Sequence, residues 1–379
     1  MGRPAGRYAP WSFATLGVVS AIIAVSLSPG NARSAAGQDW SPFVLVAGLL
    51  LIGLVANDDG LFEALGQRLA RLSSNGFVLF GGATAIIAVV TALLNLDTAV
   101  AFLTPVLIYT ARSRGSGEGP LLYGSLLLAN AGSLFLPGSN LTNLIVLGHL
   151  RLTGGAFLAR MWAPALAALA MTALVIAILE RRSLGRAPTS VAALRRPTWG
   201  VGALATLSAT VAVLLLPSPA AAVAGIGVVA VGRHLMKGRT ERRRVTDALG
   251  APYLVGLFGL AVSLGAMGRA WSGPATLLSH VNSGGTAVVG ALLSLLFNNL
   301  PAASLLSART PPHPFALLIG LNLGPNVFAT GSLAWLLWLR AARAAGAHPS
   351  LARASQLGGV AVPLSMGLSL AVLVASGHG

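Results

Sequence analysis

One carboxylic acid in this sequence is set apart by its surroundings. The chain of 379 residues contains nine acidic residues, and eight are expected in loops or at the ends of apolar segments. Asp97 alone is flanked on both sides by long apolar runs. A charged carboxylate near the centre of a bilayer costs at least about 2.5–3.5 kcal/mol, so such a residue is a functional candidate. Because loss of water favours the protonated form, we predict that Asp97 couples transport to protons; the alternative is a structural hydrogen bond.

The other acidic residues suggest less chemistry. Three acidic residues are expected to be solvated at the cytoplasmic end of the transport path: Asp58, Asp59 and Glu63. The alternative is a secondary role in admitting protons. The six histidines are expected in loops, and they form no H-E-x-x-H pattern. The chain has no Cys and no G-x-x-x-x-G-K-[ST] motif, so a thiolate metal site and a P-loop ATPase within this chain are excluded. We therefore expect a transporter rather than an enzyme, with no metal site and no cofactor.

Neutral amides and hydroxyls form a second group of candidates. They lie at two expected hairpin tips and in two stretches broken by Gly and Pro, residues 130–143 and 322–332. The predicted substrate-binding set is Asn95, Thr98, Ser139, Asn140, Thr142, Asn143, Asn298, Asn299, Asn326, Thr330 and Ser332, with Gly138, Gly324 and Gly331 as helix-break glycines. Such side chains can simply satisfy main-chain groups freed by a helix break. We favour convergence of tips and breaks on one cavity, because the cluster occurs twice in the same order.

The charge of these segments bears on the substrate. No Arg or Lys falls in either hairpin tip or either break. The predicted site therefore offers amides, hydroxyls and helix dipoles without a fixed positive charge. This composition favours a neutral polyhydroxyl solute or a small cation over a strongly anionic one, although helix N-termini alone can hold anions.

The elements that must position these residues are membrane helices. Hydrophobic residues make up 55% of the chain and charged residues only 9%, with a mean hydropathy of +0.79. A soluble protein carries about 25% charged residues, whereas this composition can supply roughly ten spans of about 20 residues. We predict an all-α polytopic protein of the cell inner membrane, with a single transport domain over residues 1–379. The first apolar run resembles a signal peptide, but we favour a retained span.

The basic residues predict the orientation in the membrane. With a cytoplasmic N-terminus and an external C-terminus, 20 of the 25 Lys and Arg residues fall on the cytoplasmic side, as the positive-inside rule requires. The net charge of +16 is thereby explained without a nucleic-acid partner. The cluster from Arg239 to Arg244 is expected to anchor this topology; docking of a cytoplasmic partner or an anionic lipid is the alternative.

This orientation requires two hairpins that enter the membrane and return. Residues 76–94 and 97–111 enter from the cytoplasm, and residues 284–297 and 299–308 enter from outside. The order of span, hairpin, broken span and span therefore occurs twice, in repeat one (about 42–179) and repeat two (about 251–376). The first repeat begins outside and the second inside, so they are predicted to be inverted-topology repeats. Cytoplasmic linkers 180–198 and 233–250 complete the chain.

At these motifs the sequence resembles the arsenite/antimonite efflux permeases (ArsB, the arsenical pump membrane proteins) of the ion transporter superfamily. The resemblance covers roughly residues 40–376. It rests on the run from Asp97 to Thr104-Pro105, on Ser139-Asn-Leu-Thr-Asn143, on Asn298-Asn-Leu-Pro301, and on Leu323-Gly-Pro followed by Gly331-Ser-Leu-Ala and Leu336-Leu-Trp-Leu339. Two departures stand out: Leu96 separates Asn95 from Asp97, and Asn326 replaces the family's usual Lys.

The resemblance implies export of trivalent arsenic or antimony in exchange for protons, by alternating access across the lipid bilayer. Arsenite, as neutral As(OH)3, suits a site of amides and hydroxyls. In some members a separate arsenite-stimulated ATPase docks on the cytoplasmic face. Two alternatives remain open. The first is a sodium-coupled carboxylate or anion permease, or a Na⁺/H⁺ antiporter, of the same superfamily, in which Na⁺ is coordinated by Asn95, Ser139, Asn299 and Ser332. The second is a channel-like membrane subunit that depends on a partner ATPase.

Overall fold

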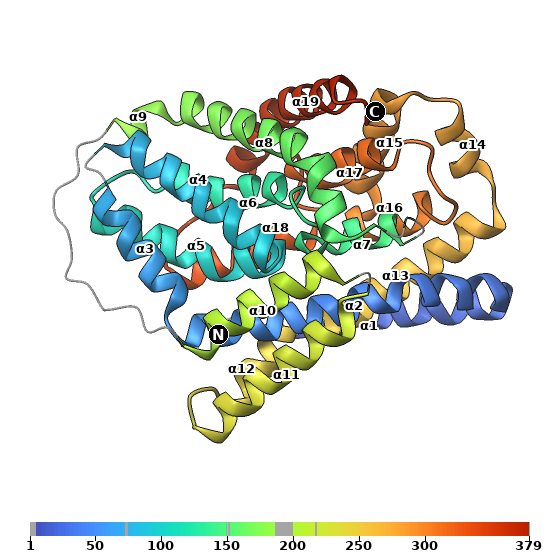
Figure 1. Cartoon of the computed structure of the whole chain (residues 1–379), viewed down its shortest axis with the longest axis horizontal. Helices are drawn as coiled ribbons and strands as arrows, with labels where there is room; N and C mark the ends of the chain where they lie inside the picture. The colour runs from blue at the N-terminus through green and yellow to red at the C-terminus, as the bar shows by residue number, and fades with distance from the viewer. Residues whose placement is uncertain are drawn as a thin grey trace.

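The computed structural model describes residues 5–72, 75–148, 150, 152–185, 200–216 and 218–378, and throughout them the regular structure is helical (Figure 1). Of the arginines used to predict the orientation, Arg3, Arg151, Arg186, Arg195 and Arg196 lie outside the described residues. In the first half the elements are α1 (Ala5–Leu27), α2 (Pro29–Asp58), α3 (Leu61–Leu72), α4 (Gly76–Leu93), α5 (Leu96–Ser113), α6 (Gly119–Gly132), the 3₁₀ turn η1 (Pro137–Ser139), α7 (Leu141–Leu147), α8 (Gly154–Leu179) and α9 (Arg181–Leu184).

The second half repeats this pattern of long and broken helices. Its elements are α10 (Val201–Leu215), α11 (Ala220–Met236), α12 (Arg242–Leu249), α13 (Ala251–Ala270), α14 (Gly273–Ser279), α15 (Ser283–Phe297), α16 (Asn299–Leu306), α17 (Pro314–Leu323), the 3₁₀ turn η2 (Gly324–Asn326), α18 (Leu333–Ala344) and α19 (Leu351–Ala375).

The apolar helices fit a bilayer rather than water. Among the described residues, five helices are long and apolar enough to cross a membrane. Large apolar side chains also cover the outside of the bundle: Leu204 on α10 is 67% exposed, Val229 on α11 is 71% exposed and Leu296 on α15 is 71% exposed. Lipid tails solvate such side chains at no cost, whereas water would penalise each of them. The predicted all-α polytopic membrane protein is confirmed.

Both predicted hairpins are present. Helices α4 and α5 are joined by the two residues Leu94 and Asn95, and α15 and α16 by Asn298 alone. In Figure 1 the α4–α5 hairpin lies toward the left end of the bundle and the α15–α16 hairpin toward the right end. The two hairpins therefore approach the middle from opposite ends, as inverted repeats require.

Both predicted helix breaks are present as well. In the first half, α6 ends at Gly132 and the chain passes through η1 before α7 resumes at Leu141; in the second, α17 leads into η2, and α18 starts at Leu333. Two buried indoles stabilise the second break: Trp335 Nε1 donates to the Pro325 carbonyl at 2.7 Å, and Trp338 Nε1 donates to the Leu122 carbonyl of α6 at 2.8 Å. The first bond closes the second break on itself, and the second joins α18 to the first repeat.

Helix α2 is the most buried of the five candidate membrane spans in the described part of the chain. It has 30 residues, which makes it about 45 Å long at about 1.5 Å per residue, and it packs on α1, α10, α11 and α13. Small residues allow these close approaches: a Cβ on Gly48 of α2 would come within 2.8 Å of the Ala224 main chain of α11. Close packing of small residues is the usual way in which membrane helices associate.

The structure differs from the sequence prediction at two connections. The second span does not begin near residue 42: α2 starts at Pro29, and Ser28 alone separates it from the end of α1 at Leu27. Proline is well suited to the first turn of a helix. Residues 233–250, predicted as a linker, contain the last turn of α11 and the whole of α12. Gly238 and Gly250, with φ of +63° and +54°, provide the sharp bends on either side of α12.

Candidate transport site

The amides of the two helix breaks are bonded to one another across the repeats. Asn322 of α17 is the centre of this network: its Oδ1 accepts hydrogen bonds from Ser133 Oγ at 2.7 Å and Asn140 Nδ2 at 2.6 Å. Its Nδ2 donates to Asn143 Oδ1 at 2.8 Å and to the Leu318 carbonyl at 2.8 Å. All four polar residues that meet here are buried. The breaks are thus brought together in a bonded contact between the two repeats, and the predicted convergence on one cavity stays a prediction.

A second cross-repeat bond lies beside this network. Asn130 Nδ2 donates to Asn326 Oδ1 at 2.8 Å, and Asn326 Nδ2 donates to the Leu127 carbonyl at 3.1 Å. The sequence prediction contained Asn326 but not Asn130, Ser133 or Asn322. These three residues could have been predicted, because they are polar and lie at the ends of α6 and α17, where these helices lead into the two breaks.

Each hairpin tip contacts the break of its own repeat. In the second repeat, the Asn299 N–H donates to the Gly331 carbonyl at 2.8 Å, and Thr330 Oγ1 donates to the Leu295 carbonyl at 2.9 Å. In the first repeat, Ser139 Oγ donates to the Ala92 carbonyl of α4 at 3.5 Å. A movement of either hairpin therefore acts directly on the adjacent break.

Three of the predicted asparagines cap helices that begin at a tip or a break. The side-chain oxygen of Asn95 accepts from the Thr98 N–H at 2.6 Å, that of Asn140 from the Thr142 N–H at 3.2 Å, and that of Asn298 from the Leu300 N–H at 3.4 Å. Asparagine is among the best N-cap residues because its side-chain oxygen satisfies an otherwise unpaired amide. These oxygens have a structural task whatever else their side chains do.

Asn298 also carries backbone strain. Its φ of +75° is the one positive φ at a non-glycine position among the described residues. With ψ of 147°, the residue occupies a region that is largely reserved for glycine, at a cost of about 1–3 kcal/mol. Such strain concentrates at functional sites, and here it lies at the tip of the second hairpin.

Four members of the predicted substrate set keep unused hydrogen-bonding capacity. Within the described part of the chain, Asn95 Nδ2, Thr98 Oγ1, Thr142 Oγ1 and Ser332 Oγ are buried and have no partner. A buried polar atom without a partner costs about 1–3 kcal/mol. These atoms are accordingly the ones in the set that gain most from a bound solute or ion.

The glycines at the breaks differ in what they permit. A Cβ on Gly324 would come within 2.6 Å of Ala291 Cα on α15, and one on Gly331 within 2.6 Å of Pro325 Cα. Glycine is needed at both positions because another main chain passes too close for a side chain. Gly138 has only ordinary contacts, with Val213 Cγ1 at 3.4 Å.

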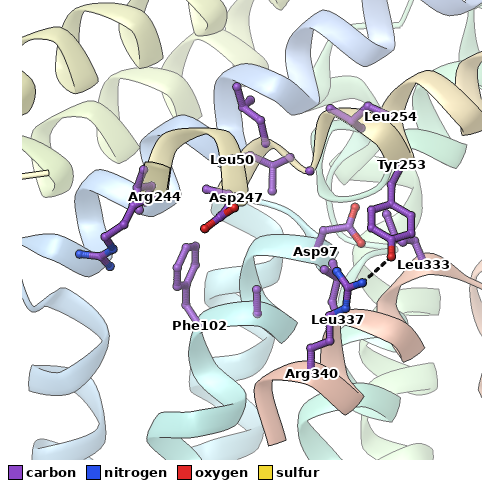
Figure 2. Close-up of a pocket in the computed structure, with 15 residues that line it drawn as sticks. Leu50, Asp97, Phe102, Arg244, Asp247, Tyr253, Leu254, Leu333, Leu337 and Arg340 are labelled. Carbon is purple, nitrogen blue, oxygen red and sulfur yellow. Dashed lines mark hydrogen bonds between the residues drawn. The ribbon is translucent and has the colours of Figure 1, made fainter. Parts of the chain in front are cut away.

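Asp97 lies in the first turn of α5 and faces a cavity of about 320 Å³, which we call the Asp97 cavity (Figure 2). Its walls come from α2, α5, α12, α13 and α18, represented by Leu50, Phe102, Asp247, Tyr253 and Leu337. The N-terminus of α5 faces the carboxylate, and this positive end of the helix dipole favours a negative charge.

The same cavity contains positive charge that the sequence prediction lacked. Arg340 of α18 and Arg244 of α12 both line it. Arg340 Nη2 donates to the Tyr253 hydroxyl at 2.5 Å, and its guanidinium carbon lies 5.0 Å from the centre of the Tyr253 ring. The expectation of a site without fixed positive charge is wrong for this cavity, because residues distant from the tips reach it through the packing of α12 and α18. Arg340 lies on the same face of α18 as Leu333 and Leu337, a spacing that was visible in the sequence.

The acidic residues at the end of α2 are paired rather than solvated. The Asp58 and Asp59 side chains are each 2% exposed. Asp58 pairs with Arg244 at 2.6 Å and accepts from Thr240 Oγ1 at 2.5 Å, whereas Asp59 pairs with Arg239 and with His234 of α11, each at 3.4 Å. The predictions that these acids are solvated and that every histidine lies in a loop are therefore wrong. The arginine cluster anchors α12 to α2.

A further buried carboxylate, on the same helix, was also missed. Asp39 lies inside α2 and is only 1% exposed. The sequence prediction placed it in a loop or at a segment end, because the Gly, Ser and Gln residues around it are typical of a loop, although α2 has already begun.

Comparisons with known proteins agree with this architecture. The family profile described as "Citrate transporter" (CitMHS) matches residues 9–339 of the chain. The chain belongs to this family. Within the citrate transporter family, its relatives include the arsenical pump membrane protein of Escherichia coli, 28% identical over 380 aligned positions that cover 89% of this chain and 86% of that protein. The same protein of Yersinia enterocolitica is 28% identical over 376 positions, with the same coverage.

A more distant relative and a solved structure extend the picture. The inner membrane protein YbiR of Escherichia coli K12 is 25% identical over 310 positions, covering 81% of each chain. The YdaH transporter of Alcanivorax borkumensis, which has an unusual topology, matches the fold with a TM-score of 0.55, at 15% identity and covering 90% of this chain and 87% of that chain. The resemblance to arsenical pumps is confirmed at the level of the family, and this chain is a multi-pass membrane transporter.

Proposed function

We propose that this protein is a secondary active transporter that exports trivalent arsenic or antimony in exchange for protons, by alternating access. The observation that carries the proposal is Asp97, a carboxylate in the first turn of a hairpin helix that faces a membrane-embedded cavity. An ionisable group in such a place is a functional candidate by default, and we assign proton binding to it because protonation removes the charge of a carboxylate that is short of water. The relatives named arsenical pump membrane proteins support arsenite, or antimonite, as the substrate.

The chemistry of the substrate suits the unused polar atoms of the tips and breaks. As(OH)3 is neutral near pH 7 and offers three hydroxyl groups, each of which donates and accepts hydrogen bonds. The hydroxyls of Thr98, Thr142 and Ser332 and the amide of Asn95 are the atoms that we assign to it. Because the chain has no Cys, the metalloid travels through this protein without forming a thiolate complex.

The remaining members of the predicted set support the site indirectly. Asn140, Asn143 and Asn326 hold the breaks together, and Asn298, Asn299, Ser139 and Thr330 tie the hairpins to the breaks. We propose that these bonds rearrange as the hairpins move, which couples substrate release to proton binding. We place the N-terminus and the arginine-rich α12 in the cytoplasm and the C-terminus outside, in accordance with the positive-inside rule.

An anion permease is the second candidate function, and it has a specific observation in its favour. Arg244 and Arg340 line the Asp97 cavity, and a guanidinium binds a carboxylate through two parallel hydrogen bonds. The family's description as citrate transporters fits such a substrate. In this alternative, Na⁺ at Asn95, Ser139, Asn299 and Ser332 replaces the proton, and the substrate is taken up rather than exported.

Reconstitution of the purified chain into proteoliposomes separates these functions. With an imposed proton gradient and no other protein, the proposed function predicts movement of arsenite against its concentration, without sodium and without ATP. Sodium-dependent movement of citrate with no movement of arsenite would establish the anion permease instead. A lack of gradient-driven flux for either solute, restored by adding an arsenite-stimulated ATPase, would make the chain a subunit of a pump.

A further inference from the structure

We propose that Asp39 is a second proton-binding site, loaded from a cavity at the end of the molecule opposite to the Asp97 cavity. The proposal rests on the proposed proton-coupled transport, which it extends by a second carboxyl group. Asp39 lies on α2, where its side chain meets α16 of the second hairpin. The assignment follows from its burial, its partners and the cavity that its chain neighbours line.

The partners of Asp39 leave half of its carboxyl group unsatisfied. Ser304 Oγ of α16 donates to Asp39 Oδ2 at 2.9 Å. The other oxygen, Oδ1, is buried and has no hydrogen-bond partner in the described part of the chain. A fixed negative charge with a bare oxygen in this position is costly. Binding of a proton removes that charge and gives the carboxyl group an O–H to donate.

The nearest positive charge does not neutralise Asp39 by direct contact. Arg269 of α13 lies near the pair of Asp39 and Ser304, since a Cβ on Gly265 would come within 3.2 Å of Arg269 Nη1 and 3.6 Å of Ser304 Cβ. Its Nη2, however, is bonded to Gln38 Oε1 and its Nη1 donates to the Gly265 carbonyl at 2.9 Å. None of the ion pairs among the described residues includes Asp39. A permanent structural carboxylate would be expected to pair with this guanidinium directly. The geometry instead allows Asp39 to alternate between charged and neutral forms beside a constant positive charge.

In the described part of the chain, few titratable side chains lie on the helices near Asp39, and Arg309 Nη2 donates to the Arg269 carbonyl at 3.4 Å. Of the helices that pack near this part of α2, α7 and α16 contain no titratable residue. On α13, Tyr253 lies in the first turn, at the Asp97 cavity, and Arg269 lies in the last turn. On α11, Arg233 and His234 lie in the last turn, beside Asp59. Arg269 is thus the charged group that faces Asp39.

A second cavity lies beside this part of α2, lined by chain neighbours of Asp39 but not by Asp39 itself. It has a volume of about 790 Å³ and is lined by Gln38 and Ser41 of α2, on either side of Asp39 in the sequence, and by Arg269. We call it the Arg269 cavity. Further lining residues, such as Gly148 and Pro219, lie at the start of the α7–α8 connection and in the α10–α11 turn.

The two cavities lie at opposite ends of the bundle. Helix α13 runs from Tyr253, in the Asp97 cavity, to Arg269, in the other cavity. On α2, Asp39 lies 14 residues before Gly53, or about 21 Å along the helix axis. Gly53 packs against Thr98, the residue after Asp97. The Asp97 cavity is lined by Asp97 and Asp247, whereas Asp39 lies next to Gln38, which lines the other cavity. Helix α2 connects the two levels.

The proton balance is simple. A hydronium ion of the Arg269 cavity transfers its proton to Asp39 and becomes water, the carboxylate becomes a neutral carboxyl group, and Arg269 keeps its charge. Because Ser304 belongs to the second hairpin, this change of charge occurs at the hairpin whose tip contacts the second break. External protons would then act on the second hairpin through Asp39, while Asp97 exchanges protons with the other side.

Infrared difference spectroscopy of the full-length protein in lipid tests the proposal without relying on transport. Spectra recorded as the pH is changed report the C=O stretch of each carboxyl group that gains a proton. The wild type and the Asp97→Asn variant should both contain a protonated-carboxyl band that is missing from Asp39→Asn. The Ser304→Ala variant, which keeps the carboxyl group and loses its hydrogen bond, should retain the band at a shifted frequency. Identical bands in Asp39→Asn and wild type would overturn the proposal.

A flux measurement then assigns the side from which Asp39 is loaded. In vesicles with a fixed pH on the α12 side, the wild-type rate should depend on the pH of the opposite compartment, and Asp39→Asn should lose most of this dependence, whereas Asp39→Glu should recover it. An unchanged dependence in Asp39→Asn would also overturn the proposal. If the wild type moves no arsenite at all, the proposed function fails, and the infrared band still decides whether Asp39 binds a proton.

Discussion

The main-chain N–H of Asn299 donates a hydrogen bond to the carbonyl oxygen of Gly331 at 2.8 Å. This single bond joins the tip of the second hairpin to the second helix break, and the side chains of Asn298 and Thr330 reinforce it. Gly331 cannot carry a side chain, because a Cβ would lie 2.6 Å from Pro325 Cα. The tip and the break therefore form one unit, in which a change at the break is transmitted to the hairpin.

The strain at the hairpin tip is open to a direct test. Asn298→Gly should leave the thermal unfolding midpoint in detergent unchanged or raise it, because glycine adopts φ of +75° without a steric cost. Asn298→Val should lower the free energy of unfolding by about 1–3 kcal/mol, since a β-branched side chain is poorly tolerated there. Equal midpoints for the two variants would show that the tip is not strained.

Two adjacent glycines of α19 provide a matched pair. A Cβ on Gly358 would lie 1.8 Å from the Asn326 carbonyl oxygen of η2, whereas nothing lies within 4 Å of a Cβ on Gly359. Gly358→Ala should push α19 away from the second break and reduce both transport and thermal stability. Gly359→Ala should be neutral or stabilise the helix by up to about 1 kcal/mol. Tolerance of both substitutions would contradict the close approach of α19 to the break.

The cross-repeat amide network should contribute measurably to stability. Asn322→Ala removes the partner of Ser133, Asn140 and Asn143, so it should lower the free energy of unfolding by about 1–3 kcal/mol. The half-buried Asn31, whose amide contacts Ser28 nearby in the chain, is the control, and Asn31→Ala should cost less than about 0.5 kcal/mol. Chemical denaturation in mixed micelles would measure both values, and a harmless Asn322→Ala would refute the network's structural role.

The pair of Asp58 and Arg244 should hold α12 over the Asp97 cavity. The two charged groups are 2.6 Å apart with Asp58 nearly inaccessible to water, and flexible glycines flank α12. Asp58→Asn should accelerate trypsin cleavage at residues 242–244 roughly tenfold, if loss of the pair lowers the free energy of releasing α12 from α2 by about 1.4 kcal/mol. Asp247→Asn, which removes only an exposed pair at 3.8 Å, should leave the cleavage rate within about twofold, since surface pairs contribute little. Equal cleavage rates for the two variants would show that the pair of Asp58 and Arg244 does not hold α12 in place.

The sequence predicted the architecture because hydrophobicity and charge act locally. Apolar length identified the spans, and the polar residues Asn95 and Asn298 marked the hairpin tips that α4–α5 and α15–α16 form. The boundaries of α2 were less accessible. Ser, Gly and Gln around Asp39 suggested a loop, but α2 continues through them: they line a cavity, and Gln38 is held by a hydrogen bond to the Ile145 carbonyl.

The candidate site was predictable in its residue types more than in its partners. The asparagines of the two breaks were singled out, yet their pairing across the repeats depends on contacts between residues nearly 200 positions apart, such as Asn130 and Asn326. Arg244 and Arg340 were missed for the same reason, since both enter the Asp97 cavity from helices remote in the sequence. Local patterns carry no information about which helix closes a cavity.

Metalloid flux into everted membrane vesicles tests the central claim most directly. Vesicles with wild-type protein and with Asp97→Asn would receive the same imposed proton gradient, with comparable protein levels in the membrane as the control. The account predicts arsenite accumulation in wild-type vesicles and its loss in Asp97→Asn, because asparagine keeps the shape of the side chain but cannot carry a proton. Undiminished, gradient-driven accumulation in Asp97→Asn would contradict the assignment of proton coupling to the first hairpin.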